Sequence, residues 1–545
     1  MKRWSIILIV VAIVLSGLLL GIRYFDQPEE MEKFQLRIDG TLILDAETIL
    51  QDGELYLSQS QIQSIPGIVS FQEGESIHVF SADRQNMLTI EPEQVWINRE
   101  PLEQNNGFLS NGEYYLSASI VQDALGTPIH WSAVKSGAAL QSGSVPYAEY
   151  HVNGRVRLRS EPSSFASAVD ILTPMSRVFV YEETPLNKAD WIFVVTASGR
   201  EGYVKKDQVS LYENMDPIQR ANKKFSEPIL LAWDYFNENT ALTYKLEPAI
   251  GLNILSPTWF SLQKEGGDFT ILDMGNETYR AWAGQQGYSV WGLFKNDFNP
   301  DWTKEMLRDP QQRLTVEREI MRLAKAYRLE GINLDFENIY EEDRDYLSQF
   351  VRELFIMTRE ADLFLSMDVT RPGGSPNWSL CYDRKELAKA LDYVFLMAYD
   401  EYYAGAGESG PVASLQWTEE SIQMTLEEVP AEQLVLGIPL YVRRWQEPLT
   451  GTGKARSKAL TLNGVQNIID ERELTPVWDP SARQFKVTYE DDQGYYQIWL
   501  EDDLSMYQRM QLIHKYQLAG FGAWRKGFET DSTWNNLFGF LSIGK

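Results

Sequence analysis

The chain has 545 residues, enough for three or four domains, and 44% of them are hydrophobic, so large cores can form. Its formal net charge of -27 argues against nucleic acid or an anionic membrane surface as the main partner. The single cysteine, Cys381, excludes an intrachain disulfide and a cysteine-based zinc cluster.

The N-terminus carries a long apolar run. Lys2 and Arg3 precede a hydrophobic stretch from Trp4 to Ile22, about long enough to span a bilayer as a helix. The two cations favour a cytoplasmic N-terminus with the rest of the chain outside the cytoplasm. No clear Ala-x-Ala cleavage site and no cysteine that could carry a lipid accompany the run. We expect residues 1–24 to be an uncleaved single-pass membrane anchor, and a cleaved signal peptide is the alternative.

Residues 33–142 contain a weak internal repeat. Ile38–Gly40 recurs as Ile97–Arg99, and Asp52–Ser58 recurs as Asn111–Ser117, at a constant offset of 59 residues (97−38 and 111−52). Each unit predicts a strand, a turn with Asp-Gly or Asn-Gly, and a Tyr-x-Leu strand. Short helical pieces are expected at Ser58–Ile62 and Ala118–Ala124. The pattern resembles the small α+β domain first described at the N-terminus of copper amine oxidases, which is often found in bacterial cell-wall proteins.

Residues 147–213 consist of short β-runs separated by turns. The runs are Val156–Pro162, Val178–Tyr181, Trp191–Val194 and Gly199–Val204. Their order resembles a bacterial SH3 domain, a small β-barrel that docks on peptidoglycan in many wall enzymes and serves only as a spacer in others. Both roles stay open at this point.

From residue 225 to residue 545, apolar β-runs alternate with helical patterns, which is typical of βα units and a parallel sheet. Eight strands are predicted, at Ile229–Trp233, Gly251–Leu255, Ser289–Phe294, Gly331–Phe336, Leu363–Asp368, Tyr393–Tyr399, Leu434–Pro439 and Gly520–Trp524. Eight such strands fit a TIM barrel, whose sites lie at the C-terminal ends of the strands. The stretch 441–500 is too long for one βα unit. We expect a small inserted antiparallel segment there that walls one side of the cleft, with a hairpin at Phe485–Tyr489 and Tyr495–Trp499.

Polar and apolar residues alternate along the fourth predicted barrel strand. On a strand, Asn333, Asp335 and Glu337 share one face. Burying charge is costly, so this face is a poor choice for a purely structural strand. Two neighbouring carboxylates perturb each other, so that one can hold a proton near neutral pH while the other stays ionised. The pattern predicts an acid site, and an edge strand with solvated acids is the alternative.

The same stretch resembles the Asp-Gly-x-Asp-x-Asp-x-Glu signature of the family 18 chitinases and endo-N-acetylglucosaminidases. Asp335 and Glu337 match its last two acids, whereas Glu330 and Asn333 replace the first two. The Asn-x-Asp-Phe-Glu-Asn form looks most like the bacterial branch associated with spore cortex and peptidoglycan. Later strands also match family motifs, namely Met397–Asp400 for Met-x-Tyr-Asp, Gly437–Pro439 for Gly-Ile-Pro and Gly520–Trp524 for the terminal tryptophan.

This resemblance implies a substrate-assisted retaining mechanism, in which the sugar's own 2-acetamido oxygen attacks the anomeric carbon. Glu337 would then be the general acid that later activates water as a base. Asp335 would accept the acetamide N–H, and Tyr399 would donate its hydroxyl to the acetamide oxygen. The resemblance further assigns substrate contacts to Asp400 at the sugar hydroxyls, Met397 beneath the acetamide and Trp524 under the sugar ring.

Asn333 departs from the family, which usually has an Asp there that shares a proton with the next Asp. An amide can hydrogen-bond Asp335 but cannot ionise, so we expect an altered acid limb of the pH–rate profile. Tryptophans near strand ends can stack on sugars or pack in the barrel; these are Trp233, which we include among the substrate-binding candidates, and Trp259, Trp291 and Trp378. Glu501, Asp502 and Asp503 are expected to cap a helix that starts near Leu504.

These features predict a hydrolase that cleaves β-1,4 bonds after N-acetylglucosamine, with peptidoglycan favoured over chitin because of the wall-associated modules. A catalytically silent glycan-binding protein is the rival, although such lectins typically lack the acid that is present here as Glu337. A structural wall or sporulation factor is a third alternative. No cofactor or metal is expected, since His78 and His130 show no ligand spacing. The expected partners are the glycan and the membrane, with no nucleic acid; a monomer is expected, located at the cell membrane or else secreted to the cell wall.

Overall fold

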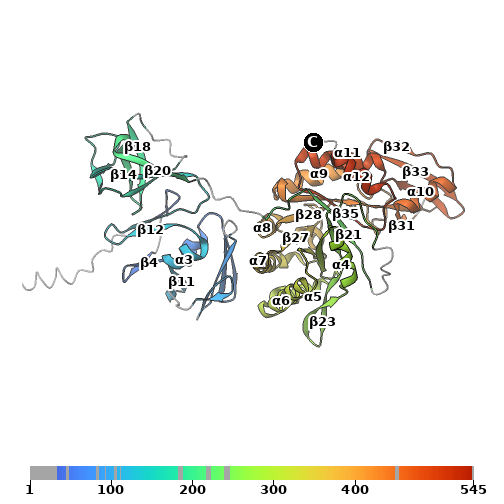
Figure 1. Ribbon diagram of the computed structural model, residues 1–545, viewed down its shortest axis with the longest axis horizontal. Coiled ribbons are helices and arrows are strands. Elements are labelled where there is room, and N and C mark those ends of the chain that lie inside the picture. Colours follow the sequence, from blue (N-terminus) through green and yellow to red (C-terminus); the bar gives the residue numbers. More distant parts are fainter. Residues whose placement is uncertain are drawn as a thin grey trace, which may run out of the picture. The chain divides into compact units, whose positions relative to one another are not determined.

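The computed structural model describes residues 34–43, 48–81, 85–91, 94–102, 107–110, 112–181, 188, 190–215, 223–237, 246–448 and 453–542. The membrane anchor expected at residues 1–24 lies outside these ranges. Within them, no helix is both long and apolar enough to cross a membrane. The chain divides into two compact units, Met1–Arg220 and Ala221–Lys545, and Figure 1 colours the second from green to red.

The first unit contains two copies of one strand–helix element. Strands β4 (Glu54–Ser58) and β11 (Glu113–Ser117) pair antiparallel, with Leu57 opposite Leu116. A helix follows each strand, α2 (Gln59–Gln63) and α3 (Ala118–Leu125), and the last serine of the strand caps it through its side-chain oxygen. Apolar side chains from both copies pack into one core. The 59-residue repeat in the sequence therefore corresponds to a repeated structural element.

Three sheets build this part of the first unit. Their strand orders are β12-β13-β1-β2, β10-β11-β4-β3 and β5-β6-β7-β8-β9. The remaining strands are β1 (Gln35–Ile38), β2 (Thr41–Ile43), β3 (Ile49–Gln51), β5 (Ile68–Glu73), β6 (Ser76–Ser81), β7 (Asn86–Ile90), β8 (Val95–Ile97), β9 (Glu100–Pro101), β10 (Gly107–Ser110), β12 (Ile129–Ser132) and β13 (Gly137–Leu140).

Residues 147–215 form a seven-stranded antiparallel sheet with the order β16-β15-β19-β18-β17-β14-β20. Its strands are β14 (Tyr147–Val152), β15 (Val156–Arg159), β16 (Ala168–Leu172), β17 (Arg177–Tyr181), β18 (Trp191–Thr196), β19 (Glu201–Lys205) and β20 (Val209–Met215), with a short helix η1 (Lys206–Gln208) before the last. Valines, leucines and one isoleucine from these strands form a separate core. The four β-runs named from the sequence all lie in this sheet.

The second unit is a closed barrel of eight parallel strands. They are β21 (Ile229–Asp234), β22 (Ile254–Pro257), β25 (Ser289–Lys295), β26 (Gly331–Asp335), β27 (Phe364–Val369), β28 (Tyr393–Met397), β29 (Leu434–Pro439) and β35 (Gly520–Trp524). Each pairs in parallel with the next, β35 pairs with both β29 and β21, and the pairing of β22 with β25 completes the ring. The barrel that the sequence predicts is confirmed.

Helices cover the outside of the barrel, as Figure 1 shows for α4 to α8 around β27 and β28. The helices of this unit are α4 (Glu277–Gln285), α5 (Pro300–Arg308), α6 (Pro310–Ala326), η2 (Glu341–Asp343), α7 (Arg344–Glu360), η3 (Pro376–Leu380), α8 (Arg384–Ala388), α9 (Leu415–Leu426), η4 (Ala431–Gln433), α10 (Leu462–Glu471), α11 (Asp503–Tyr516) and α12 (Thr533–Ser542).

Two antiparallel additions interrupt the βα alternation. One is a hairpin, β23 (Phe260–Glu265) and β24 (Asp268–Asp273), which the sequence prediction missed. The other is the predicted insertion after β29, a five-stranded sheet with the order β31-β30-β34-β33-β32 and helix α10 beside it. Its strands are β30 (Tyr441–Glu447), β31 (Arg456–Thr461), β32 (Val477–Asp479), β33 (Gln484–Asp491) and β34 (Gly494–Trp499).

Three barrel strands, β22, β26 and β28, are shorter than predicted, and local structure explains two of these differences. β22 starts three residues later than expected because Gly251 has a φ of +86°, a left-handed conformation that belongs to a turn. β28 ends at Met397, and the N–H of Ala398 bonds to the carbonyl of Leu396 at 2.8 Å. Tyr399 therefore lies on the loop after the strand.

Candidate active site

Strand β26 presents two chemically different faces. Ile332 and Leu334 are fully buried on one face, and Asn333 and Asp335 lie on the other. Asn333 accepts a hydrogen bond from Trp233 of β21, a strand that is not adjacent to β26, so this polar face points into the barrel. The alternation in the sequence thus places Asp335 inside the barrel at the C-terminal end of its strand.

Glu337 follows two residues later, and its backbone is held on both sides. The Asn296 side chain accepts a hydrogen bond from the Glu337 N–H at 3.0 Å and donates one to its carbonyl at 2.7 Å. The Tyr382 hydroxyl donates to the carbonyl of Phe336 at 2.7 Å. Asn296 and Tyr382 are both buried. These contacts fix the chain from which the Glu337 carboxyl projects.

Burial separates the acids at the end of β26 into different protonation states. It raises the pKa of Glu337 well above its usual range, and the charges of Asp335 and Asp400 raise it further. Burial also raises the pKa of Asp335, to about 6, against the opposing charge of Lys295. At neutral pH, Glu337 therefore carries a proton and Asp335 is mostly ionised, as a proton donor beside an anionic partner requires.

Asn333 is the centre of a buried hydrogen-bond network. Its Nδ2 donates to Asp368 Oδ1 at 2.8 Å and to Ser366 Oγ at 3.1 Å. Its Oδ1 accepts from Trp233 Nε1 at 2.9 Å and from Ser256 Oγ at 3.4 Å. An amide at this position can in principle hydrogen-bond Asp335, but both of its N–H groups are used by residues of β27.

The loop after β28 brings Tyr399 and Asp400 beside the acids of β26. Burial raises the pKa of Tyr399 well above its usual range, as do the nearby charges of Asp368, Asp335 and Glu337, so its hydroxyl stays a donor. Asp400 has a φ of +61°, and its Oδ1 accepts from the Tyr441 hydroxyl at 2.7 Å and from Arg443 Nη2 at 2.9 Å. Because β30 supplies both donors, the insertion borders the site.

The predicted apolar contacts divide into buried and accessible groups. Met397, the last residue of β28, is nearly buried, and Trp524 at the end of β35 is partly exposed. The Trp233 ring lies 6.2 Å from that of Trp524 but is only 1% exposed, so its predicted stacking on a sugar is wrong as the barrel stands. Trp259 and Trp291 are fully buried core residues, whereas Trp378 is 42% exposed and lies 6.1 Å from the ring of Phe298.

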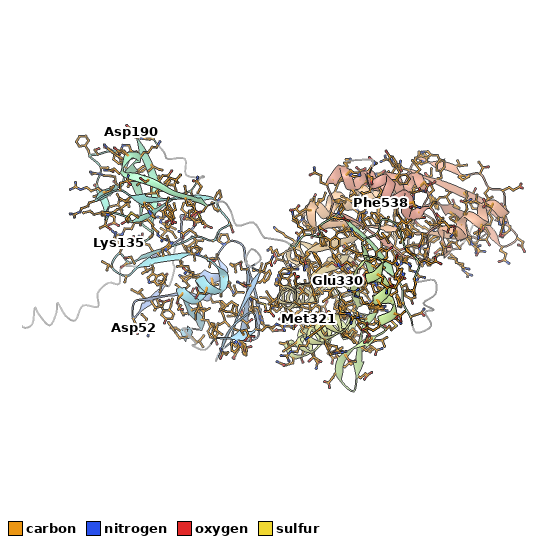
Figure 2. The ribbon with its side chains drawn as sticks, in the orientation of Figure 1. Asp52, Lys135, Asp190, Met321, Glu330 and Phe538 are labelled. Atoms are coloured by element: carbon orange, nitrogen blue, oxygen red, sulfur yellow. The ribbon has the colours of Figure 1, made fainter. Side chains whose placement is uncertain are left out.

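Glu330 occupies the first acidic position of the motif but lies at the opposite end of β26, where Figure 2 labels it. Its carboxylate pairs with Arg280 and accepts a hydrogen bond from the N–H of Val290 at 2.8 Å. Both contacts tie β26 to its surroundings at the strand start. Glu330 is therefore a structural residue.

The acidic run after β34 caps a helix, as the sequence predicts. Asp502 is the N-cap of α11 and accepts from the N–H of Ser505, and Glu501 pairs with Arg509 at 2.8 Å inside the fold. Among the residues that the structure describes, no group of three or more His, Cys, Asp or Glu side chains is placed to hold a metal ion.

Residues 300–529 match the model of the glycosyl hydrolases family 18. This segment of the chain is similar to the family 18 glycosyl hydrolases. The match runs from α5 to just beyond β35, so it includes β26 and the strand ends that carry Tyr399, Asp400 and Trp524.

Two relatives and one solved structure place this domain among known proteins. Over 240 residues the chain is 28% identical to YdhD of Bacillus subtilis (strain 168), and the match covers 44% of this chain and 56% of YdhD. Over 249 residues it is 26% identical to the cortical fragment-lytic enzyme of the same organism, covering 45% and 57%. The chain thus spans little more than half the length of these relatives. The spore cortex-lytic enzyme SleL of Bacillus cereus shares the fold, with a TM-score of 0.53 and 19% identity over 61% of this chain and 77% of that one.

Sequence reasoning missed three residues of this site. Asp368 is buried on β27, Asn296 holds the Glu337 backbone, and Arg443 pairs with Asp400. Asp368 ends the predicted run Leu363–Asp368, and a lone acid at the end of a strand that is otherwise nearly apolar was the available signal. Asn296 follows its strand directly, but a contact to backbone leaves no pattern in the sequence.

Proposed function

We propose that this chain is a glycoside hydrolase that cleaves β-1,4 bonds after N-acetylglucosamine in peptidoglycan. The observation that carries the proposal is the placement of Asp335 and Glu337 at the end of β26, where burial raises the pKa of Glu337 well above its usual range and that of Asp335 to about 6. This pair lies within the segment that matches family 18. Family 18 enzymes are retaining glycosidases that use the substrate, not a second carboxylate, as nucleophile.

The proposed reaction has two steps. First, Glu337 donates its proton to the glycosidic oxygen while the acetamide oxygen of the sugar bonds to C1, giving an oxazolinium ion and releasing the leaving chain. The anionic Asp335 accepts the acetamide N–H and stabilises the developing positive charge, and the Tyr399 hydroxyl orients the acetamide oxygen. Second, Glu337 takes a proton from water as the water oxygen bonds to C1. The bond between C1 and the acetamide oxygen breaks, so the oxazolinium ring opens and the acetamide is restored.

The substrate contacts follow the same strand ends. Asp400, held by Tyr441 and Arg443, faces the sugar hydroxyls, Met397 lies beneath the acetamide, and the partly exposed Trp524 forms the floor under the sugar ring. Peptidoglycan and chitin both offer the acetamide. The similarity to a cortical fragment-lytic enzyme supports peptidoglycan, and chitin is the second candidate.

The remaining parts of the proposal concern location and accessory domains. We propose that residues 1–24 anchor the chain in the cell membrane with the barrel outside the cytoplasm, on the evidence of the apolar run behind Lys2 and Arg3. The repeat domain and the SH3-like sheet would then stand between membrane and wall, as wall-binding modules or as spacers.

The test is digestion by the full-length chain in mild detergent. Purified peptidoglycan and chitin oligosaccharides are incubated with the protein, and the new reducing ends are identified by mass analysis. We expect N-acetylglucosamine at the reducing ends from peptidoglycan, and a loss of about 10² to 10⁴ in kcat for Glu337→Gln. Glu330→Gln is the matched control, since it neutralises a carboxyl at the other end of the same strand and should leave kcat unchanged.

The outcomes separate the candidate functions. Cleavage of chitin alone would replace peptidoglycan with the second candidate. Binding of either glycan without any product that Glu337→Gln lacks would favour the glycan-binding alternative and refute the proposed hydrolysis.

A further inference from the structure

A third buried acid, Asp368, lies beside the proposed catalytic pair of Asp335 and Glu337. Asp368 is on β27, which pairs in parallel with β26 so that Asn333 is opposite Ser366 and Leu334 is opposite Met367. One step further along, this register sets Asp335 opposite Asp368, with both side chains on the face that points into the barrel. Neighbouring strands lie about 4.8 Å apart, so the two carboxyl groups are close neighbours.

One carboxylate oxygen of Asp335 lacks a hydrogen-bond donor. Its Oδ1 is buried and has no hydrogen-bond partner among the described residues. Buried carboxylate oxygens normally accept at least one hydrogen bond, because a buried oxygen without one costs its full desolvation penalty. Asn333 cannot serve it, since both of its amide hydrogens are given to Asp368 and Ser366. Asp368 is the neighbour in register with it, and it becomes a donor when it carries a proton.

The local charges also require that at least one of the neighbouring carboxyl groups carries a proton. Three carboxyl groups, Asp335, Glu337 and Asp368, meet in this buried space. The cation next to Asp335 in register is Lys295 of β25, and it already pairs with Asp297 at 2.9 Å. Three buried anions beside one shared cation would be too costly.

The surroundings assign a proton to Asp368. It is only 2% exposed, whereas Asp335 lies nearer the strand end and is partly exposed. Burial raises the pKa of Asp368 well above its usual range, as do the charges of Asp335 and Glu337, and hydrogen bonds from Asn333 and Trp233 oppose this. Tyr399 faces the same group from the loop after β28 and brings no positive charge.

We propose that Asp368 is a positioning residue that holds a proton against Asp335, donating an O–H hydrogen bond to the buried Oδ1 of that carboxylate. This inference rests on the proposed function only for the role of Asp335 toward the acetamide. The bond fixes the Asp335 carboxylate and leaves its second oxygen for the substrate N–H. Asn333 in turn holds Asp368 in place. No proton leaves Asp368 during the reaction, so Asp335 keeps its negative charge when the oxazolinium ion forms.

The first test needs no substrate. Infrared spectra of the full-length chain at pH 7 report the C=O stretch of protonated carboxyl groups. Glu337→Gln serves as the background, since it removes the proton of Glu337 itself. We expect the difference spectrum between this background and the same background with Asp368→Asn to show the loss of one protonated-carboxyl band. Burial raises the pKa of Glu501 to about 7, but its band is present in both spectra and cancels in the difference. Asp392→Asn is the matched control and should keep the band, because Asp392 is equally buried but is paired with Arg359 and bonded to the N–H of Leu365.

The second test reads out catalysis. In the otherwise unchanged chain, Asp368→Ala, which removes the donor to Asp335, should lower kcat by about 10²-fold, as expected for a misplaced group, with KM changed less than about twofold. Asp368→Ala should also move the acid limb of the pH–rate profile by about one pH unit, since the hydrogen-bond donor to Asp335 is gone. Asp368→Asn, whose amide N–H can still donate to the Oδ1 of Asp335, should keep most of the activity.

The results distinguish the two proposals. A difference spectrum without a lost protonated-carboxyl band, or an unaltered pH–rate profile in Asp368→Ala, would overturn the proton-holding role. If the wild type cleaves neither glycan while the band behaves as expected, the proposed function fails and the proton assignment stands. Asp368→Ser, which keeps an acceptor for Asn333, replaces Asp368→Asn if the latter does not fold.

Discussion

Neutralising Asp335 should stabilise the protein while it removes activity. The pKa of this carboxyl rises from 3.8 to about 6 on folding, mainly because of burial. A group whose pKa is higher in the folded state binds its proton more tightly there, so stability declines as pH rises through the window between the two values. Below pH 3.8 both states are protonated and nothing is lost. Above about pH 6 the full cost applies.

The magnitude follows from the size of this shift. About two pKa units at 1.36 kcal/mol each give about 3 kcal/mol at pH 7.5, and the same relation gives about 1 kcal/mol at pH 4.5. Asp335→Asn removes the charge and keeps the volume. We therefore expect this variant to be more stable than the wild type by about 3 kcal/mol at pH 7.5, which raises Tm by several degrees, and by about 1 kcal/mol at pH 4.5.

Thermal unfolding followed by tryptophan fluorescence at the two pH values checks this. The probe reports mainly on the barrel, because only four of the 16 tryptophans precede residue 221. Asp392→Asn is the control, since it leaves the partly buried Arg359 without its carboxylate and should destabilise by about 3 kcal/mol at both pH values. If Asp335→Asn also lowers Tm at pH 7.5, or changes it equally at both values, burial is not what raises the Asp335 pKa.

Two further predictions concern charge and core structure. Asp400→Asn removes one of the charges that raise the Glu337 pKa, so Glu337 should lose its proton more easily and the basic limb of the kcat/KM profile should move to lower pH; an unmoved limb would contradict this coupling. Glu353 is bonded to the buried Arg313 through two N–H groups, so Arg313→Met would leave it as an unpaired buried charge. We expect this variant to destabilise the barrel unit by about 3 to 5 kcal/mol in urea unfolding. A loss below about 1 kcal/mol would show that Glu353 finds another partner.

The sequence predicted the barrel because its strands are apolar runs of the right length between helical patterns. The run Leu434–Pro439 became β29 with the same bounds, and Gly520–Trp524 became β35. The hairpin β23–β24 was missed because its strands are half polar and follow directly on β22, where a helix was expected. Periodicity identifies the elements that share a buried core and does poorly for additions at the rim.

Periodicity alone predicted the site only as far as it lies on one strand, and the family motifs added Met397, Tyr399, Asp400 and Trp524 from other strand ends. Asn333, Asp335 and Glu337 are two residues apart, so their shared face is a local property. Which strand lies beside β26, and in what register, is a property of the whole barrel. Asp368 becomes a neighbour of Asp335 only through that pairing. For the same reason the partners of Asn333 could not be predicted, since they come from β21, β22 and β27.

The position of the acids in the barrel limits how much they lower its stability. Each raised pKa at Glu337, Asp335 and Asp368 means that folding works against the ionised form of that group, so the site itself lowers the stability of the fold. Apolar strands such as β29 are buried along their whole length and oppose this cost. Confining the acids to the C-terminal ends of neighbouring strands lets a few positions carry the electrostatic strain while the rest of each strand supplies the core. Substitutions that neutralise an acid at these ends should therefore trade activity for stability, whereas acid-to-amide changes at paired carboxyls such as Asp392 should lose stability alone.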